Sequence, residues 1–225
     1  MNQLRNIFQT SIKIVQRHPF MKLIIENQYL SPICFYSFLN SGFHVIFEQY
    51  DNYQKMSFRN RCIVGGPAGP ISLSIPLQGG RDQKIISRDV KIANRYNWQD
   101  QHWRTIQSCY NRAPWFEHFG PGLEKYYRTE YESLTKWNFD LFKLMLSMLE
   151  LNLEIDLTKI WQEEYDQQEY LDLRNEILPR NYKKFPCQEY QQVFAEKTGF
   201  LPNLSILDIL FCKGKNAIKS LAIVP

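Results

Sequence analysis

The stretch from His102 to Phe116 contains side chains that could take part in catalysis. His102 is a candidate acid or base because an imidazole titrates near neutral pH. If the stretch is helical, Trp103 and Tyr110 fall on one apolar face, and Pro114 limits the helix to the residues before it. The helix would bury that face and leave His102 at its margin, where the walls of pockets form. A histidine at the start of a helix is nonetheless more often structural than catalytic.

The second such stretch, from Asp51 to Arg61, is basic and follows a predicted strand at 44–50. It therefore sits at the carboxyl end of that strand, which is where ligands bind in open α/β sheets. Three of its side chains are cations that could bind a phosphate or a carboxylate, and an arginine can do so with two parallel hydrogen bonds. The same residues are equally compatible with a solvated, basic strand edge that binds no ligand. The candidate ligand-binding residues of this stretch are Tyr53, Lys55, Arg59, Asn60 and Arg61.

Other candidates lie outside this basic stretch. Asp208 stands between apolar residues of a predicted helix at 204–212, so a buried Asp208 would need a partner such as an arginine. Asn203 precedes that helix and is predicted to be its N-cap. The ligand-binding candidates outside the basic stretch are Arg104, Tyr110, Arg112, Asn203 and Asp208.

Spacing supports neither a thiol–imidazole pair nor a metal site. Cys109 follows His102 by seven residues, about 10.5 Å along a helix, whereas a nucleophile and its base need a hydrogen bond of about 3 Å. We therefore interpret Cys109 as a small core residue. The other three histidines show no metal-binding spacing with the acidic residues. The glycines at 65–69 lack the phosphate-loop pattern, and we identify no cofactor.

The pattern of apolar residues predicts an α/β fold. A strand at 22–26, a helix at 33–39 and a strand at 44–50 would form a βαβ unit with parallel, neighbouring strands. The glycine-rich turn at 65–69 is predicted to be the connection of a hairpin. The segment 85–92 is predicted to be a short edge strand, so that the sheet would be mixed.

The C-terminal half is predicted to be largely α-helical from residue 98 onward. Gly120–Gly122 is predicted to break the helical pattern, with one long helix or two short ones at 123–151. A strand at 155–160 would return to the sheet, and 161–190 is interpreted as a mobile segment or lid.

The domain organisation follows from this reading. Residues 1–21 are predicted to be an N-terminal helical extension, and residues 22–225 a single domain. That domain consists of an α/β part at 22–97 and a mainly helical part at 98–225.

Composition restricts the class of protein. The net charge is +4, yet from Lys55 to Arg112 there are ten basic residues against three acidic ones. An uneven distribution of this kind attracts anions. Five cysteines without a CxxC motif indicate reduced thiols, and no segment is long and apolar enough to span a membrane. We therefore expect a cytoplasmic protein. Nucleic acid is the weaker option, because the pI of 8.7 is low for such a partner.

Several motifs stand in order along the chain, namely Tyr53–Arg61, Gly69–Pro76, His102–Ile106, Tyr110–Phe116 and Phe200–Phe211. Together they resemble the WbqC-like family over roughly residues 22–214. One departure stands at Glu26–Pro32, where many members carry Gln-Pro-x-Tyr-Leu-Pro after the first strand; this chain keeps only Tyr29-Leu30 and a shifted proline. If that turn touches a ligand, the ligand or its fit differs here.

The resemblance implies a place in surface-polysaccharide (O-antigen) biosynthesis, where transfer of an acyl or aminoacyl group to a sugar precursor has been suggested. In that reading the basic stretch holds an anionic small molecule, a nucleotide-activated donor or a sugar precursor. His102 is the base, and the Asp51 carboxylate or the Tyr29 hydroxyl orients the acceptor. The alternative is a non-catalytic accessory protein that holds a polysaccharide intermediate or a protein partner. The sequence leaves open whether the protein is an enzyme at all, and what its oligomeric state is.

Overall fold

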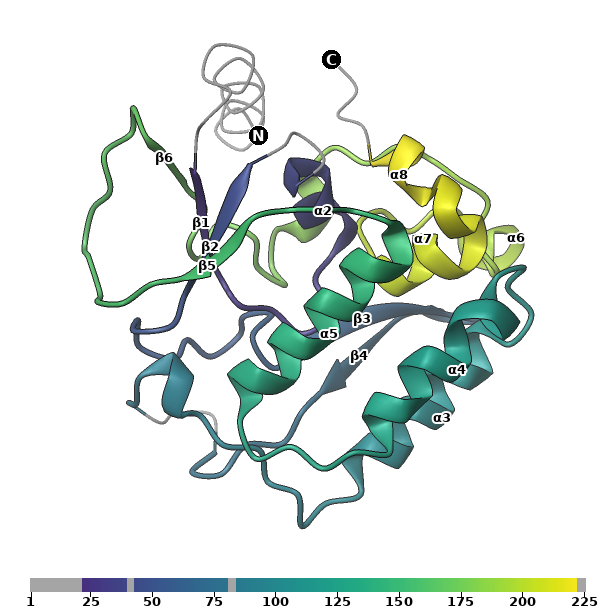
Figure 1. Cartoon of the computed structure of the whole chain (residues 1–225). Coiled ribbons are helices and arrows are strands. Elements are labelled where there is room, and N and C mark those ends of the chain that lie inside the picture. The colour runs from purple at the N-terminus through teal and green to yellow at the C-terminus, as the bar shows by residue number, and fades with distance from the viewer. Residues whose placement is uncertain (1–21, 40–42, 81–83, 222–225) are drawn as a thin grey trace.

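The computed structural model describes residues 22–39, 43–80 and 84–221 (Figure 1), so the predicted extension at 1–21 lies outside the described residues. The predicted α/β class is confirmed. The βαβ unit is formed by β1 (Lys22–Glu26), α2 (Ile33–Leu39) and β2 (His44–Glu48). β1 and β2 pair in parallel and in register, so that Glu26 lies opposite Glu48.

Two later strands complete a four-stranded parallel sheet with the order β5-β2-β1-β6. β5 (Ile155–Leu157) pairs with β2, so the strand predicted at 155–160 is confirmed for its first three residues. β6 (Tyr170–Asp172) pairs with β1. Part of the segment 161–190, interpreted from the sequence as a mobile segment or lid, is thus a strand of the parallel sheet. There, backbone hydrogen bonds to β1 hold a three-residue strand in which only Leu171 is aliphatic and packs against the core.

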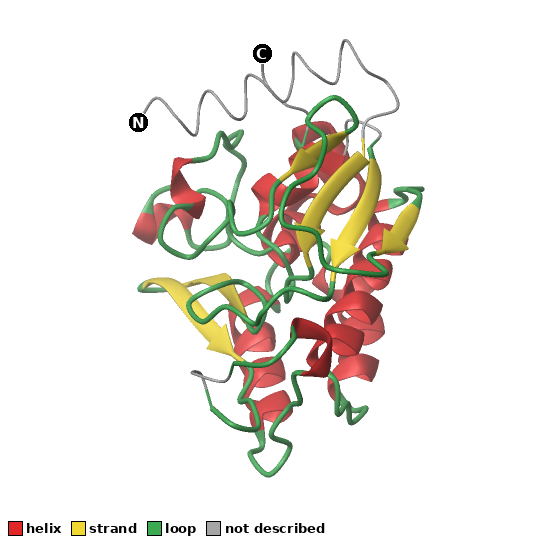
Figure 2. Ribbon diagram, turned by 90° about the vertical axis from the view of Figure 1, so that its left-hand side faces the viewer, coloured by secondary structure: helices red, strands yellow, loops and turns green. Residues whose placement is uncertain are grey.

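The predicted hairpin is confirmed as β3 (Arg61–Gly66) and β4 (Gly69–Ser74), an antiparallel pair that forms a second sheet. Gly69 has a φ of 119°, a conformation that L side chains rarely adopt. Figure 2 shows the hairpin apart from the parallel sheet.

The edge strand predicted at 85–92 is wrong. This segment contains a 3-10 turn at Ser87–Asp89, and only isolated bridges at Ile86, Lys91 and Ile92. Its backbone is held elsewhere: the Ser87 amide donates to the Asp51 carbonyl oxygen at 2.8 Å, which ties the turn to the segment after β2.

Three helices follow, α3 (Trp98–Tyr110), α4 (Phe116–Tyr127) and α5 (Leu134–Leu149). The break predicted at Gly120–Gly122 is wrong, because these residues lie inside α4. A methyl group on Gly122 would lie 3.0 Å from the Met148 Cε atom, so this glycine lets α4 approach α5 closely. The helical region at 123–151 consists of the end of α4 and of α5, which agrees with the option of two helices.

The chain ends in α6 (Ala195–Thr198), α7 (Ile206–Lys213) and α8 (Ala217–Ser220). The N-cap of α7 is Ser205, whose hydroxyl accepts a hydrogen bond from the Leu207 amide at 3.4 Å. The prediction of Asn203 as N-cap is therefore wrong. The Asn203 carboxamide instead donates to the carbonyl oxygens of Tyr182 and Phe185, at 3.0 and 2.8 Å, and anchors a neighbouring loop.

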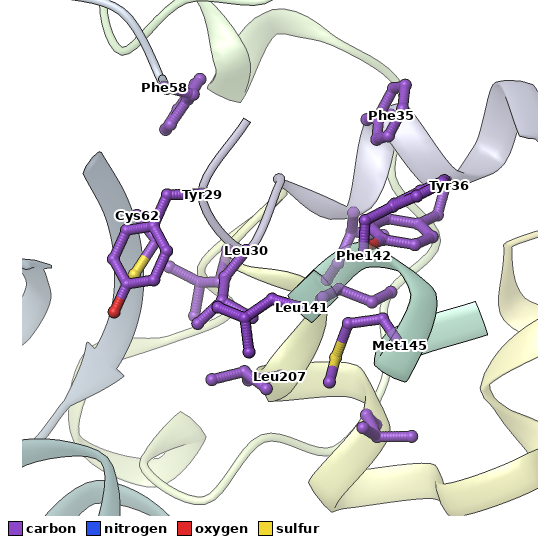
Figure 3. Close-up of a cluster of buried hydrophobic side chains, with 14 of the residues drawn as sticks. Tyr29, Leu30, Phe35, Tyr36, Phe58, Cys62, Leu141, Phe142, Met145 and Leu207 are labelled. Atoms are coloured by element: carbon purple, nitrogen blue, oxygen red, sulfur yellow. The ribbon is translucent and has the colours of Figure 1, made fainter. Parts of the chain in front are cut away.

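The core joins the parallel sheet to the helices through α5. The Phe142 ring of α5 lies 5.9 Å from Phe35 of α2 and 4.9 Å from Phe47 of β2. Figure 3 shows Phe142 near Phe35 and Tyr36, with Leu141 and Met145 toward Leu207 of α7. Cys109 is buried, as expected for a core residue. Within the described ranges, no helix has the length and apolar character needed to cross a membrane.

Candidate functional site at the carboxyl edge of the parallel sheet

Buried charges gather where the four parallel strands end. Glu26 ends β1 and Glu48 ends β2, and they lie opposite each other in the register. Both side chains are almost completely buried. Carboxylates so placed are stable only when each finds hydrogen-bond donors or a cation.

Each of the two carboxylates has its own partners. The Glu26 oxygens accept hydrogen bonds from the Gln28 side chain at 2.7 Å and the Asn175 amide at 2.8 Å. One Glu48 oxygen accepts from the Thr158 hydroxyl at 2.8 Å, and the other lies 3.4 Å from an Arg174 guanidinium nitrogen. Segments that follow β5 and β6 therefore supply hydrogen-bond donors to both carboxylates, and Arg174 adds a positive charge beside Glu48.

A buried ion pair joins Arg59 to Asp51 at the same edge. A second Arg59 nitrogen donates to the Asn175 side-chain oxygen at 3.0 Å, so the network runs from Gln28 through Glu26 and Asn175 to Asp51. The Asp51 Oδ1 and Arg59 Nε atoms are buried and have no hydrogen-bond partner. The position predicted for the basic stretch is confirmed, but Arg59 faces into the protein.

Other residues of the basic stretch line a pocket of about 330 Å³, which we call the basic pocket. The Tyr53 hydroxyl donates to the Asn60 side-chain oxygen at 3.0 Å, and the Asn60 amide donates to the Ile75 carbonyl oxygen at 2.9 Å. The Arg61 Nε atom is buried without a hydrogen-bond partner. The structure thus brings four of the five predicted ligand-binding residues of this stretch together. The pocket is lined by Tyr53, Lys55, Met56, Asn60, Arg61, Ser74, Ile75, Pro76, Leu77 and Gly80.

A second pocket, of about 360 Å³, lies between the strand ends and the first turns of α5, and we call it the edge pocket. It is lined by Asn27, Phe47, Glu48, Gln49, Thr135, Lys136, Phe139, Asp140, Lys143 and Leu157. No sequence-predicted site residue is among them.

Tyr29 and His102 are brought together, but inside the core. The Tyr29 hydroxyl lies 3.0 Å from His102 Nδ1 and 2.5 Å from the Tyr127 hydroxyl. Figure 3 shows the Tyr29 ring beside Cys62 of β3. Burial lowers the pKa of His102 from 6.5 to about 4, so the imidazole is neutral at pH 7. His102 is 6% exposed and lines neither pocket, so it does not stand at a pocket margin as expected.

Tyr110 and Asp208 form a separate buried cluster. The Asp208 carboxylate accepts hydrogen bonds from the hydroxyls of Tyr110 at 2.9 Å and Tyr190 at 2.6 Å. Burial raises the pKa of Asp208, and these hydroxyls act against that rise. Asp208 is thus buried and has hydrogen-bond partners, as expected for a buried carboxylate, but the partners are tyrosines rather than the arginine suggested by the sequence. It lines neither pocket.

Arg104 and Arg112 are exposed on and just after α3, and neither lines one of the two pockets. Across residues 22–39, 43–80 and 84–221, no group of three His, Cys, Asp or Glu side chains could hold a metal ion.

Comparison with known proteins places the chain in a family. Residues 28–182 match the WbqC-like protein family, which is more than half of the chain. The chain belongs to this family. No curated protein and no solved structure matches it significantly.

The WbqC-like region contains most of the carboxyl edge. It begins at Gln28 and includes Glu48, Asp51, Arg59 and Asn175, whereas Asn203 and Asp208 lie beyond its end at residue 182. The basic pocket lies entirely within it.

Sequence reasoning missed four charged or polar residues of the edge, namely Glu26, Glu48, Arg174 and Asn175. A signal for the first two was present: each is a glutamate that ends an apolar strand of a predicted parallel pair. The other two belong to a segment whose strand was not predicted, and nothing in the local sequence indicates that it returns to β1.

Proposed function

We propose that this WbqC-like protein is a transferase of surface-polysaccharide (O-antigen) biosynthesis that moves an acyl or aminoacyl group onto a sugar precursor. The observation that supports this is the basic pocket, which collects four predicted ligand-binding side chains. The assignment to the polysaccharide pathway and the type of group transferred rest on the family resemblance. The cytoplasm, where activated donors are made, is the compartment we propose for it.

The chemistry of the basic pocket suits the anionic part of an activated donor. Lys55 and Arg61 contribute positive charge, and none of the described residues that line the pocket is acidic. Arg61 carries a guanidinium fork, the group that matches a phosphate or a carboxylate. The pocket volume is at the lower end of the range for small-molecule sites. A phosphate or diphosphate group with part of its substituent is the ligand that we propose here.

The catalytic roles of His102, Tyr29 and Asp51 remain proposals with different support. A base works best when its pKa lies near the working pH, and a pKa of about 4 makes His102 a weak base. Asp51 is held by Arg59. The Tyr29–His102 pair could still relay a proton through the Tyr29 hydroxyl, which contacts both His102 and Tyr127.

One observation favours the second candidate, a non-catalytic accessory protein that holds an anionic polysaccharide precursor. None of the three candidate catalytic residues lines either pocket. A binding protein needs the basic pocket alone.

Two measurements separate these functions. The first is thermal unfolding with nucleotides, nucleotide sugars and acyl-CoAs. A true ligand at 100 times its Kd adds about 2.7 kcal/mol and shifts the midpoint by about 5–10 °C. Arg61→Ala should abolish that shift. Lys125→Ala, which removes the same charge from an exposed position on α4, should not.

The second measurement is product formation from the donor that binds, followed by mass spectrometry with a set of sugar acceptors. The transferase predicts an acylated sugar, and His102→Ala should abolish it while leaving donor affinity unchanged. Donor binding without any product would support the accessory protein. If no donor shifts the midpoint, the anion-binding role of the basic pocket is refuted.

A further inference from the structure

The end of β5 and the segment that follows it expose a run of large apolar side chains. Leu157 is 43% exposed, Ile160 63% and Trp161 52%. Residues 22–39, 43–80 and 84–221 contain five exposed large apolar side chains, and three of them fall within these five positions. Single exposed apolar residues are common on proteins, whereas a group of them marks a surface that a partner covers.

This segment lies at the edge of the molecule and is nonetheless held on both sides of the apolar run. Figure 1 shows it as the start of the loop that leaves β5 and returns to β6. The Gln49 side chain donates to the Thr158 carbonyl oxygen at 2.7 Å. Further along, the Arg174 guanidinium donates to the carbonyl oxygens of Gln162 at 2.7 Å and Glu163 at 2.9 Å. Because the backbone around Ile160 and Trp161 is already held, binding through these side chains orders little additional chain.

The apolar run is followed by acidic side chains. Glu163, Glu164 and Asp166 are exposed, and Lys159 is the one basic residue between positions 157 and 166. Within the described part of the chain, neither Glu163 nor Glu164 forms a side-chain ion pair. This end of the surface is therefore negative.

The helix α5 supplies the opposite charge on the other side of Leu157. Lys136 and Lys143 line the edge pocket together with Leu157, so the lysines lie beside the start of the apolar run. Their side chains are 69% and 53% exposed, and each lies 3.0 Å from an Asp140 oxygen. An ammonium group has three donors, so both lysines can take a second acceptor. Two lysines against one carboxylate leave this end of the surface positive.

A surface with this arrangement is complementary to itself. A two-fold rotation brings the positive end of one copy to the negative end of the other, at both ends at once, while the apolar runs meet in the middle. Such a contact closes on itself and is the commonest kind in protein oligomers. A surface of one sign would instead repel its own copy. We call this surface the α5–β5 face; it consists of Lys136, Lys143, Leu157, Ile160, Trp161, Glu163, Glu164 and Asp166.

We propose that the α5–β5 face binds the same face of a second copy of this chain, so that the protein forms a two-fold symmetric dimer. None of the residues of this face lines the basic pocket, which stays accessible in the dimer. The proposal concerns association alone, so it can hold or fail whether or not the protein is a transferase.

The first test is sedimentation velocity on the full chain over about 1–200 μM, a range that brackets the micromolar Kd of a small, transient interface. We expect the mass to rise with concentration from the 26.9 kDa of one chain to twice that value. Trp161→Ser should weaken the dimer at least about ten-fold, because a tryptophan in an interface carries a large share of the affinity. Tyr96→Ser is the matched control: Tyr96 is 51% exposed, lies outside the face, and its loss should leave the dimer unchanged.

A pair of charge reversals tests the geometry of the contact. Lys143→Glu and Glu163→Lys each place like charges at both ends of a dimer, so each variant alone should dimerise at least about ten-fold more weakly than wild type. An equal mixture of the two variants should dimerise again, because a mixed dimer has opposite charges at both ends. Trp161, Lys143 and Glu163 are all exposed, and circular dichroism checks that each variant is folded.

Three results would overturn the proposal. The first is a wild-type chain that sediments as a monomer throughout this range, which would leave the face to a partner of different sequence. The second is a Trp161→Ser variant that dimerises as well as wild type, because the contact would then lie on another face. The third is a mixture of the two charge variants that dimerises no better than either variant alone.

Discussion

The buried pair of Asp51 and Arg59 gives the sharpest prediction about the framework of this site. The Arg59 side chain is 3% exposed and the Asp51 side chain 10%, so water cannot replace a lost partner. Removing one member of a buried pair costs about 3–5 kcal/mol, because the remaining charge is left uncompensated. Arg59→Met should therefore destabilise the fold by about that amount. For a chain of this size, this corresponds to a fall in Tm of roughly 6–20 °C.

A double-mutant cycle measures whether the pair itself is responsible. We expect Asp51→Leu and Arg59→Met to be costly singly, and the double variant to lose clearly less than their sum, because it buries no charge. The assay is urea unfolding followed by circular dichroism. Arg128→Met is the control, since Arg128 forms an exposed pair with Asp100 and should leave the midpoint nearly unchanged. If Arg59→Met behaves like this control, or if the two single effects simply add, the reasoning is refuted.

Three further outcomes are expected. The pKa of His102, about 4 because of burial, lies below its unfolded value of 6.5, so the unfolded chain binds more protons between these values. The free energy of unfolding should therefore fall by up to about 3 kcal/mol as the pH drops from 6.5 to 4. The fall should be smaller in His102→Gln, and urea unfolding at each pH measures both. Tyr110→Phe removes a donor to the buried Asp208 and should cost about 1–3 kcal/mol in the same assay at pH 7. Gly214 has a φ of 58°, and a methyl group added there would overlap the Trp115 ring. Gly214→Ala should therefore lower Tm by several degrees, and an unchanged Tm would contradict this account of the packing after α7.

The sequence predicted the parts of the fold whose signals are local. The βαβ unit was predictable because two short apolar strands flank the helix Ile33–Leu39. The hairpin was predictable because glycines at 65–69 separate two runs of apolar residues. Both predictions rest on residues within about thirty positions of one another, where periodicity and turn residues determine the structure.

The remaining elements depend on partners distant in sequence. Tyr170–Asp172 is short, with a single aliphatic residue, and it becomes a strand by pairing with the edge of β1. Gly120–Gly122 is a strong local signal for a break, but close packing of α4 on α5 overrides it. Ser205 rather than Asn203 caps α7, because the helix begins at Ile206; the Asn203 amide donates to a loop about twenty residues away.

The site was predicted in the same uneven way. The rule that ligands bind at the carboxyl ends of parallel strands drew attention to the segment after β2, but Asp51 and Arg59 of that segment pair with each other inside the protein, whereas Lys55 and Arg61 line the basic pocket. His102 looked available on a helical wheel, but the wheel does not show that Tyr29 and Trp98 pack against it. Amphipathic patterns identify which face of one helix is buried, and they carry no information about what an adjacent loop covers.

The arrangement of charge separates a framework from the surfaces that it supports. Four buried charged residues have partners inside the protein and so hold the strand ends and the segment after β2 in place: Glu26, Glu48, Asp51 and Arg59. In our proposal, ligand recognition falls to the basic pocket, which none of these four residues lines. Variants of the framework should consequently lose stability and binding together, whereas variants such as Arg61→Ala should lose binding with stability intact. A loss of ligand affinity is therefore evidence about the basic pocket only when the free energy of unfolding has been measured on the same variant.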